Sequence, residues 1–273
     1  MSQSRGEHLR TSAPTVVVGV DGSKAAGDAA RWAVDEAVGR DIPLRLVYVV
    51  ESSHPVGAEV GAGGHATARS ALRDAQRAVE ATGKPVQVET EILTGKPLVV
   101  LVEESRAAAM ICVGALGLNH AQHGVGSLAA SLAASALCPV AVIRRAPGQP
   151  ADHRVSRVVV EADNAALLRC AFDEARLRRA PLRAISVAAS AGPDNADGKR
   201  LAQAELSRRI APWARLYPDV PVESVVVRGT VEKYLAADGE SDQLFVTDAR
   251  VCRELCGATN AKHSVLAFRF GNL

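Results

Sequence analysis

A cluster of glycines in the middle of the chain has the spacing of an anion-binding loop. Four glycines lie between Gly114 and Gly126, Gly117 among them, and Ser127 follows directly. Glycine allows close approach of the backbone to a ligand, and successive N–H groups can then point into one concavity. The N-terminus of a following helix adds partial positive charge. The pattern therefore predicts a phosphate site, with a tight turn that serves packing alone as the alternative.

Asp21 is the second candidate, because it ends the first apolar run of the chain and is followed by Gly22. A carboxylate there can accept hydrogen bonds from ribose hydroxyls or from the amino group of adenine. In doubly wound sheets, ligands bind at the carboxyl ends of strands, where the winding direction reverses. Asp21 and the glycine loop together predict a nucleotide site. Since Asp-Gly also favours turns, a purely structural Asp21 stays open.

The elements that must position these residues are apolar runs alternating with helical stripes. Runs at 15–23, 44–51, 85–93, 110–114 and 139–145 are rich in Val and Leu. The apolar residues of the first run follow one another without alternation, which is typical of a parallel strand buried on both faces. The Gly-rich segment 52–69 is expected to be a loop, followed by a helix over 69–82. This order predicts an α/β doubly wound parallel sheet.

The chain repeats this order, which indicates an internal duplication. Residues 157–187 repeat the strand, acidic turn and helix with "DEA", and then the "PLR" and strand, of residues 15–49. We predict two tandem doubly wound domains, each a five-stranded parallel sheet flanked by helices. The expected boundaries are a flexible tail at 1–14, the first domain at 15–145, a linker at 146–153 and the second domain at 154–273. The last strands of the two domains are candidates to pair with each other.

The two repeats differ at the glycine loop. The second repeat has Gly257 alone in the corresponding segment. A glycine demanded by the fold should be present in both repeats, so the glycines of the first repeat are interpreted as functional. Asp163, which corresponds to Asp21, is interpreted as structural because it lacks a glycine loop beside it.

The segments "VVVGVDGS", "GALG", "GVGS" and "CPVAVI", in this order, resemble the universal stress protein family in its tandem-domain actinobacterial form. The ATP-binding branch of that family carries Gly, two residues, Gly, nine residues and Gly-Ser or Gly-Thr. Gly114, Gly117, Gly126 and Ser127 match this signature, with one residue fewer before Gly126. The family's fold is Rossmann-like, of the adenine nucleotide alpha hydrolase type.

The resemblance implies ATP as the ligand, with or without Mg²⁺. It implies that Gly114, Gly117, Gly126 and Ser127 hold the phosphates. It also implies that Asp21, with Gly22 in its turn, holds the nucleoside, and that Val49 lines the adenine.

The function implied is an ATP-binding stress-response and signalling module with an active first site and a degenerate second site. Such a module acts on a protein partner, and the family also allows a homodimer. Two alternatives stay open. The shortened spacer favours a scaffold that binds no nucleotide, and the related fold also hosts weak ATPases. The sequence contains neither a P-loop lysine nor a nucleophile elbow, which argues against dedicated catalysis.

Composition excludes several other classes of function. A net charge of +2 and an aromatic content of 3% argue against nucleic-acid binding. The polar start of the chain and the lack of a long apolar stretch argue against secretion and membrane insertion, so a cytoplasmic location is expected. His120 and His123 are interpreted as solvated loop residues. Cys252, Cys256 and His263 lack the ligand spacing of a metal site.

Overall fold

The computed structural model describes residues 14–51, 62–115, 127–145, 154–188, 196–238, 242–252 and 263–270. We refer to residues 14–145 as the first half and to residues 154–270 as the second half. The strands of the first half are β1 (Thr15–Val20), β2 (Leu44–Val50), β3 (Val88–Thr94), β4 (Ala108–Gly114) and β5 (Val140–Ile143). Its helices are α1 (Lys24–Arg40), α2 (Ala62–Glu80), α3 (Pro97–Glu104) and α5 (Ser127–Ser135).

The second half repeats this order of elements. Its strands are β6 (Arg157–Glu161), β7 (Leu182–Ala188), β8 (Val222–Arg228), β9 (Gln243–Asp248) and β10 (Ser264–Phe268). Its helices include α6 (Ala165–Arg178), α7 (Ala196–Leu216) and α8 (Val231–Asp238). The first helix of each half even ends in the same way, with a left-handed residue, Asp41 after α1 and Arg179 after α6.

The ten strands of the described residues belong to one sheet in the order β3-β2-β1-β4-β5-β10-β9-β6-β7-β8. Within each half the five strands are parallel, and the order is the same when read outward from the centre. The winding reverses between β1 and β4, and again between β6 and β9. The predicted fold class, an α/β parallel sheet flanked by helices, is confirmed.

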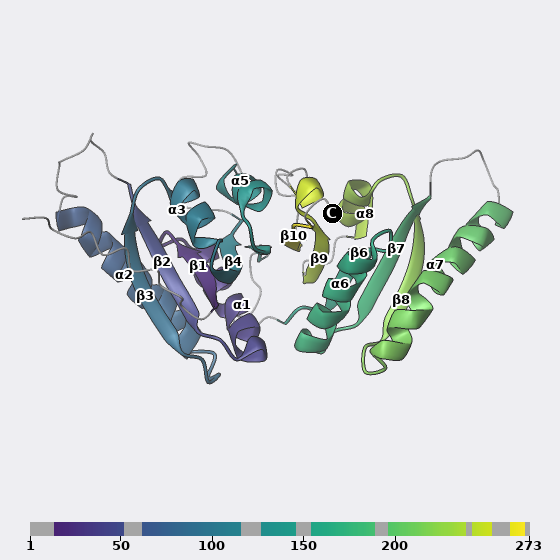
Figure 1. Cartoon of the computed structure of the whole chain (residues 1–273), viewed down its shortest axis with the longest axis horizontal. Coiled ribbons are helices and arrows are strands. Elements are labelled where there is room, and N and C mark those ends of the chain that lie inside the picture. Colours follow the sequence, from purple (N-terminus) through teal and green to yellow (C-terminus); the bar gives the residue numbers. More distant parts are fainter. Residues whose placement is uncertain are drawn as a thin grey trace, which may run out of the picture.

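The two halves meet through their last strands. β5 and β10 pair antiparallel, with Val142 opposite Val265 and Ala141 opposite Leu266. The Oγ of Ser264 also accepts a hydrogen bond from the backbone N of Arg144 at 3.1 Å. The predicted pairing of the last strands is therefore confirmed, and it joins the two five-stranded sheets into one (Figure 1).

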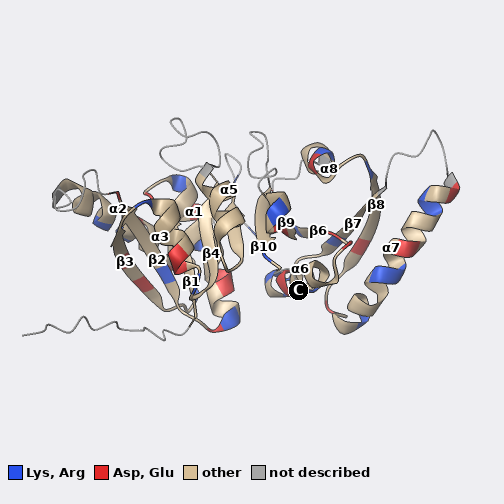
Figure 2. Ribbon diagram, turned by 45° about the horizontal axis from the view of Figure 1, so that its top comes forward, with Lys and Arg blue, Asp and Glu red and all other residues tan. Residues whose placement is uncertain are grey.

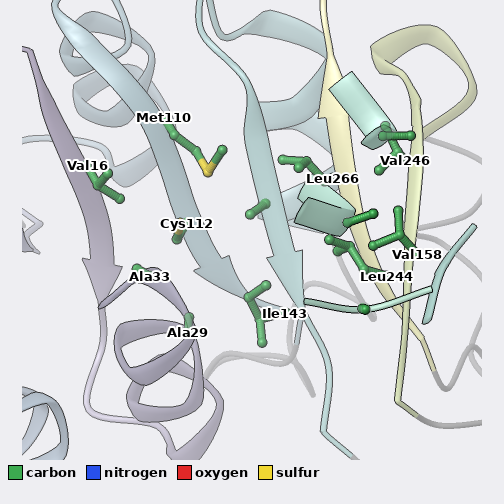
Figure 3. Packing of buried hydrophobic residues seen from close by; sticks show 14 of the residues in the cluster. Val16, Ala29, Ala33, Met110, Cys112, Ile143, Val158, Leu244, Val246 and Leu266 are labelled. Carbon is green, nitrogen blue, oxygen red and sulfur yellow. The ribbon is translucent and has the colours of Figure 1, made fainter. Parts of the chain in front are cut away.

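Each face of the sheet carries its own set of helices. Helices α1, α2, α6 and α7 bury apolar residues on one face, while α3, α5 and α8 do so on the other. The first of these cores runs through the junction, because Met110 and Ile143 belong to the same buried cluster as Val158 and Leu266 (Figure 3). The two halves therefore share one continuous hydrophobic core on this face.

The start of α2 differs from the sequence prediction. The expected loop was 52–69, whereas α2 already begins at Ala62 and includes two glycines near its start. Apolar residues from Ala68 to Val79 form a buried stripe along this helix. Burial of that stripe stabilises the helix and outweighs the unfavourable helix propensity of the glycines.

Candidate functional site

The strand ends of the first half bring three of the candidate segments to one level. Val20 of β1 pairs with Tyr48 of β2, and Val18 pairs with Cys112 of β4. Continued by one residue toward β2 and by three residues toward β4, these registers set Asp21 level with Val49 on one side and with the residue after Gly114 on the other. The level lies at the carboxyl edge of the sheet, where the winding reverses between β1 and β4. This is the place at which doubly wound folds bind ligands.

Asp21 shapes the turn from β1 into α1. Its Oδ1 accepts a hydrogen bond from the backbone N of Ser23 at 2.9 Å, and Gly22 between them has a φ of +87°. Ser23 then caps α1, because its Oγ accepts from the backbone N of Ala26 at 3.1 Å. Asp21 is half-buried and so remains partly accessible. The structural role that Asp-Gly suggests is therefore present.

Gly114 ends β4 in close contact with α1. A Cβ at this position would lie 2.6 Å from the carbonyl carbon of Ala25 and 2.7 Å from its Cβ. Real Cβ atoms do not approach backbone so closely, so the first turn of α1 can pack here only against glycine. Gly114 thus has a packing role that is independent of any ligand.

Val49 lies near the carboxyl end of β2 and is half-buried. It packs against the core on the α3 face of the sheet, and its partner in β3 is Leu93. A half-buried apolar side chain therefore lies at the same level as Asp21.

The rest of the predicted loop falls largely outside the described residues. Gly117, Gly126, His120 and His123 belong to this undescribed part. Ser127 is the first residue of α5, which packs beside α3. The structure therefore brings together Asp21, Gly22, Val49 and Gly114 and describes the start of the helix that follows the loop.

A further glycine, which sequence reasoning missed, shapes the edge of the site. Gly95, after β3, has a φ of +147°, and its N–H donates to the carbonyl of Val50 at 3.0 Å. Gly229 occupies the corresponding turn of the second half with a φ of +96°. The sequence contained a signal for this turn, because in both repeats a glycine directly follows the third strand. These two glycines meet a demand that the fold makes in both halves.

The corresponding edge of the second half is acidic. By strand register, Glu161 corresponds to Gly19 and Asp248 corresponds to Gly114. Glu161 is half-buried, and burial raises its pKa, with further contributions from the nearby Asp163 and Glu232. Asp248 forms an ion pair with Arg250 at 3.1 Å. The two halves thus present different electrostatic surroundings at equivalent strand ends.

Charges elsewhere on the described surface are mixed in sign. Helix α7 carries bands of both signs along its length (Figure 2), and its Arg209 pairs with Glu205 at 3.2 Å. Within the described ranges, no group of three or more His, Cys, Asp or Glu side chains could hold a metal ion. Among those same residues, no helix is long and apolar enough to span a membrane.

Known proteins agree with the class that this fold defines, a doubly wound α/β protein. The family model "Universal stress protein family" matches residues 13–144. Universal stress protein Rv3134c of Mycobacterium tuberculosis is 55% identical over 263 residues, which cover 96% of this chain and 98% of that protein. The chain belongs to the universal stress protein family.

Solved structures of the family cover either the whole chain or one half. A universal stress protein from Archaeoglobus fulgidus has a TM-score of 0.67 at 14% identity and covers 94% of this chain and 97% of its own. It shows that the fold extends over both halves. An Arabidopsis thaliana family protein, solved with AMP bound, covers 49% of this chain and 93% of its own at 22% identity and a TM-score of 0.36.

Proposed function

We propose that the first half binds an adenine nucleotide, ATP in particular, at the carboxyl ends of β1, β2 and β4. Asp21, in the turn that Gly22 permits, holds the nucleoside, and Val49 lines the adenine. The phosphates bind to the backbone at Gly114, Gly117 and Gly126 and to Ser127, with Mg²⁺ as their counter-ion where it is present. The observation that carries the proposal is the common level of Asp21, Val49 and the end of β4 at the point where the winding reverses.

We propose further that the second half is a degenerate copy that binds no nucleotide. Asp248 stands where the first half has Gly114, and Glu161 stands where it has Gly19. Carboxylates at this edge repel phosphate groups, and the partly buried Glu161 does so in surroundings that screen charge poorly. One nucleotide per chain is the expected stoichiometry.

The resulting function is a signalling module of the stress response in the cytoplasm. Nucleotide binding stabilises one conformation of the first half, and a protein partner distinguishes that conformation from the free one. No catalytic step is required of any residue.

A nucleotide-free scaffold is the second candidate, and one observation favours it. The contact between Gly114 and Ala25 explains that glycine without any ligand. A scaffold would act through its surfaces alone and would leave the crevice without nucleotide.

Chromatography of the nucleotide released from denatured protein separates the two candidates, followed by calorimetric titration of the purified chain with ATP. Gly117→Glu adds bulk and negative charge to the loop, so it should abolish binding. Gly63→Glu is the matched control, because a side chain at Gly63 of α2 meets nothing within 4 Å. Binding of one ATP by wild type and control but not by Gly117→Glu supports the proposal. Absence of binding in all three, both as purified and on titration, favours the scaffold.

A further inference from the structure

Helices α1 and α6 pack against each other at the junction of the two halves (Figure 1). Each carries the same pair of charged residues four positions apart, because Glu36 and Arg40 in α1 correspond to Glu174 and Arg178 in α6. We call these four residues the junction quartet. The side chains of Glu36, Glu174 and Arg178 are only 0%, 2% and 4% exposed, so water screens them little.

Both arginines contact both glutamates. Arg40 Nη2 lies 2.8 Å from Glu36 Oε2 and 3.4 Å from Glu174 Oε1. Arg178 donates through Nη2 to Glu36 Oε1, and its Nε lies 3.4 Å from Glu174 Oε2. The guanidinium of Arg178 also stacks on Trp32, with its Cζ 3.8 Å from the ring centre. The quartet is therefore an ionic connection between the halves.

The two equivalent glutamates are not bonded equally. Each carboxylate oxygen of Glu36 accepts a hydrogen bond from an arginine. Among the residues that the structure describes, the buried Oε2 of Glu174 has no hydrogen-bond partner, because its 3.4 Å contact with Arg178 does not have hydrogen-bond geometry. An ionised carboxylate oxygen without a hydrogen bond in such a place is costly. A proton on Glu174 removes that cost and creates a donor next to Glu36.

We propose that Glu174 is protonated in the native protein at neutral pH and that its proton is hydrogen-bonded to Glu36, so that the two halves share a proton across their junction. The quartet then carries one negative and two positive charges. Arg40, whose side chain is 40% exposed, keeps its charge in contact with solvent. The proton comes from solvent and returns to it when the pH rises.

The surroundings of the pair act in the same direction. Burial raises the pKa of Glu174 well above its usual value, and the neighbouring Glu36 raises it further, by its charge and as a hydrogen-bond partner. Arg178 and Arg40 oppose this shift. The other charged and titratable groups around the quartet are Asp35 of α1, Cys170 of α6 and Cys112 of β4. Burial raises the pKa of the Cys112 thiol, which keeps it neutral.

The consequence for stability follows from the direction of the shift. The pKa of Glu174 is higher in the folded protein than in the unfolded chain, so the native state binds the proton more tightly. This contribution to stability is complete below the unfolded pKa and is lost as the pH rises through the folded pKa. The junction therefore strengthens on acidification and weakens at alkaline pH.

Thermal unfolding of the full chain across pH tests the proposal with three variants. Glu174→Gln keeps a donor toward Glu36 at every pH, so its Tm should equal that of wild type at low pH and exceed it at alkaline pH. Glu36→Gln removes the anion that both arginines contact, so its Tm should fall by roughly 5 °C or more at every pH. Glu103→Gln, in α3, breaks the exposed ion pair with Arg106; it is the control and should follow wild type.

Infrared spectroscopy detects the proton directly. Wild type at neutral pH should show the carbonyl band of a buried protonated carboxyl group, and Glu174→Gln should lack it. This measurement stands even if Glu36→Gln fails to fold. The proposal is overturned if no such band exists in wild type. It is also overturned if Glu174→Gln lowers Tm at neutral and alkaline pH as much as Glu36→Gln does, which would show two ionised glutamates.

Discussion

At the carboxyl ends of their strands, the two halves of the molecule use the same backbone differently. The first half has glycine at positions 19 and 114, where the second half has Glu161 and Asp248. At the turn after the third strand, in contrast, both halves have glycine, Gly95 and Gly229. Comparison of the two repeats thus distinguishes glycines that the fold requires in both halves from glycines that occur in the first half alone.

Gly114 shows that a glycine found in the first half alone can have a packing role as well as the proposed role in ligand binding. Its contact with Ala25 means that the first half packs α1 closely against the end of β4. At the equivalent point, the second half accommodates an aspartate that interacts with Arg250. The difference between the halves is therefore one of local packing as well as of charge.

The largest expected effect comes from exchanging residues at this point. Gly114→Asp forces a side chain into the backbone of Ala25 and should lower the free energy of unfolding by about 3 kcal/mol or more. The reverse change, Asp248→Gly, removes only a hydrogen bond and an ion pair and should cost within about 1 kcal/mol. Urea denaturation of both variants measures the contrast. Equal losses would mean that the halves pack alike here.

A second contrast concerns His263, the residue before β10, which corresponds in the repeat to Cys138 before β5. Burial lowers the pKa of His263 to about 4, and the nearby Arg144 contributes to the shift. Between the ordinary pKa of 6.5 and about 4, the unfolded chain therefore binds more protons than the folded protein. Lowering the pH across this window should decrease the stability by roughly 2–3 kcal/mol. His263→Cys should flatten the dependence. Its persistence in that variant would assign it to other groups.

The opposite pH dependences of His263 and Glu174 are separable by variant. Each residue is compared with wild type at the same pH, so contributions from the remaining groups cancel. A double variant of both positions should show the sum of the two effects, since Glu174 belongs to α6 and His263 precedes β10.

A third contrast exploits the asymmetry beside the quartet. Gly39 of α1 corresponds to Leu177 of α6, and a Cβ at Gly39 would lie 2.1 Å from Leu177 Cδ1. Gly39→Leu should therefore cost about 2 kcal/mol through overpacking. Combining it with Leu177→Gly exchanges the two residues and should recover part of that loss in urea denaturation. A double variant less stable than the additive expectation would argue against a shared space.

The smallest effect is expected where the halves agree. Gly229→Ala places a side chain at a φ of +96° and should cost about 1 kcal/mol. Gly95→Ala should cost at least as much, because its Cβ would also lie 2.9 Å from Val100 Cγ2. Thermal unfolding of both variants is the measurement. A loss in only one half would mean that the turn is not a common demand of the fold.

Much of the fold was predictable because it depends on local patterns. The Val-rich strands and Ala-striped helices of residues 15–49 recur at 157–187, and this pattern predicted two doubly wound parallel sheets. The last strands of the two repeats were candidates to pair, as β5 and β10 do. The start of α2 was predicted wrongly because two glycines hid a helix whose stability comes from burial of a stripe that begins at Ala68.

The sequence allowed the residues of the candidate site to be predicted, but not the contacts between them. Asp21 and Gly114 were recognisable from their positions after apolar runs, whereas the approach of Ala25 to Gly114 depends on how α1 packs. The same holds for the junction quartet. "DEA" was visible as a mark of the repeat, but that Glu36 faces Glu174 follows only from the assembly of both halves into one sheet.

The antiparallel pairing of β5 with β10 has a consequence for how the molecule responds to dilution. Two separate subunits joined along this edge would dissociate as their concentration fell, and their association would depend on the level of expression. Within one chain, each edge meets its partner at an effective concentration set by the connecting segment and not by the number of molecules in the cell. A scarce copy of this protein therefore has the same paired arrangement as an abundant one.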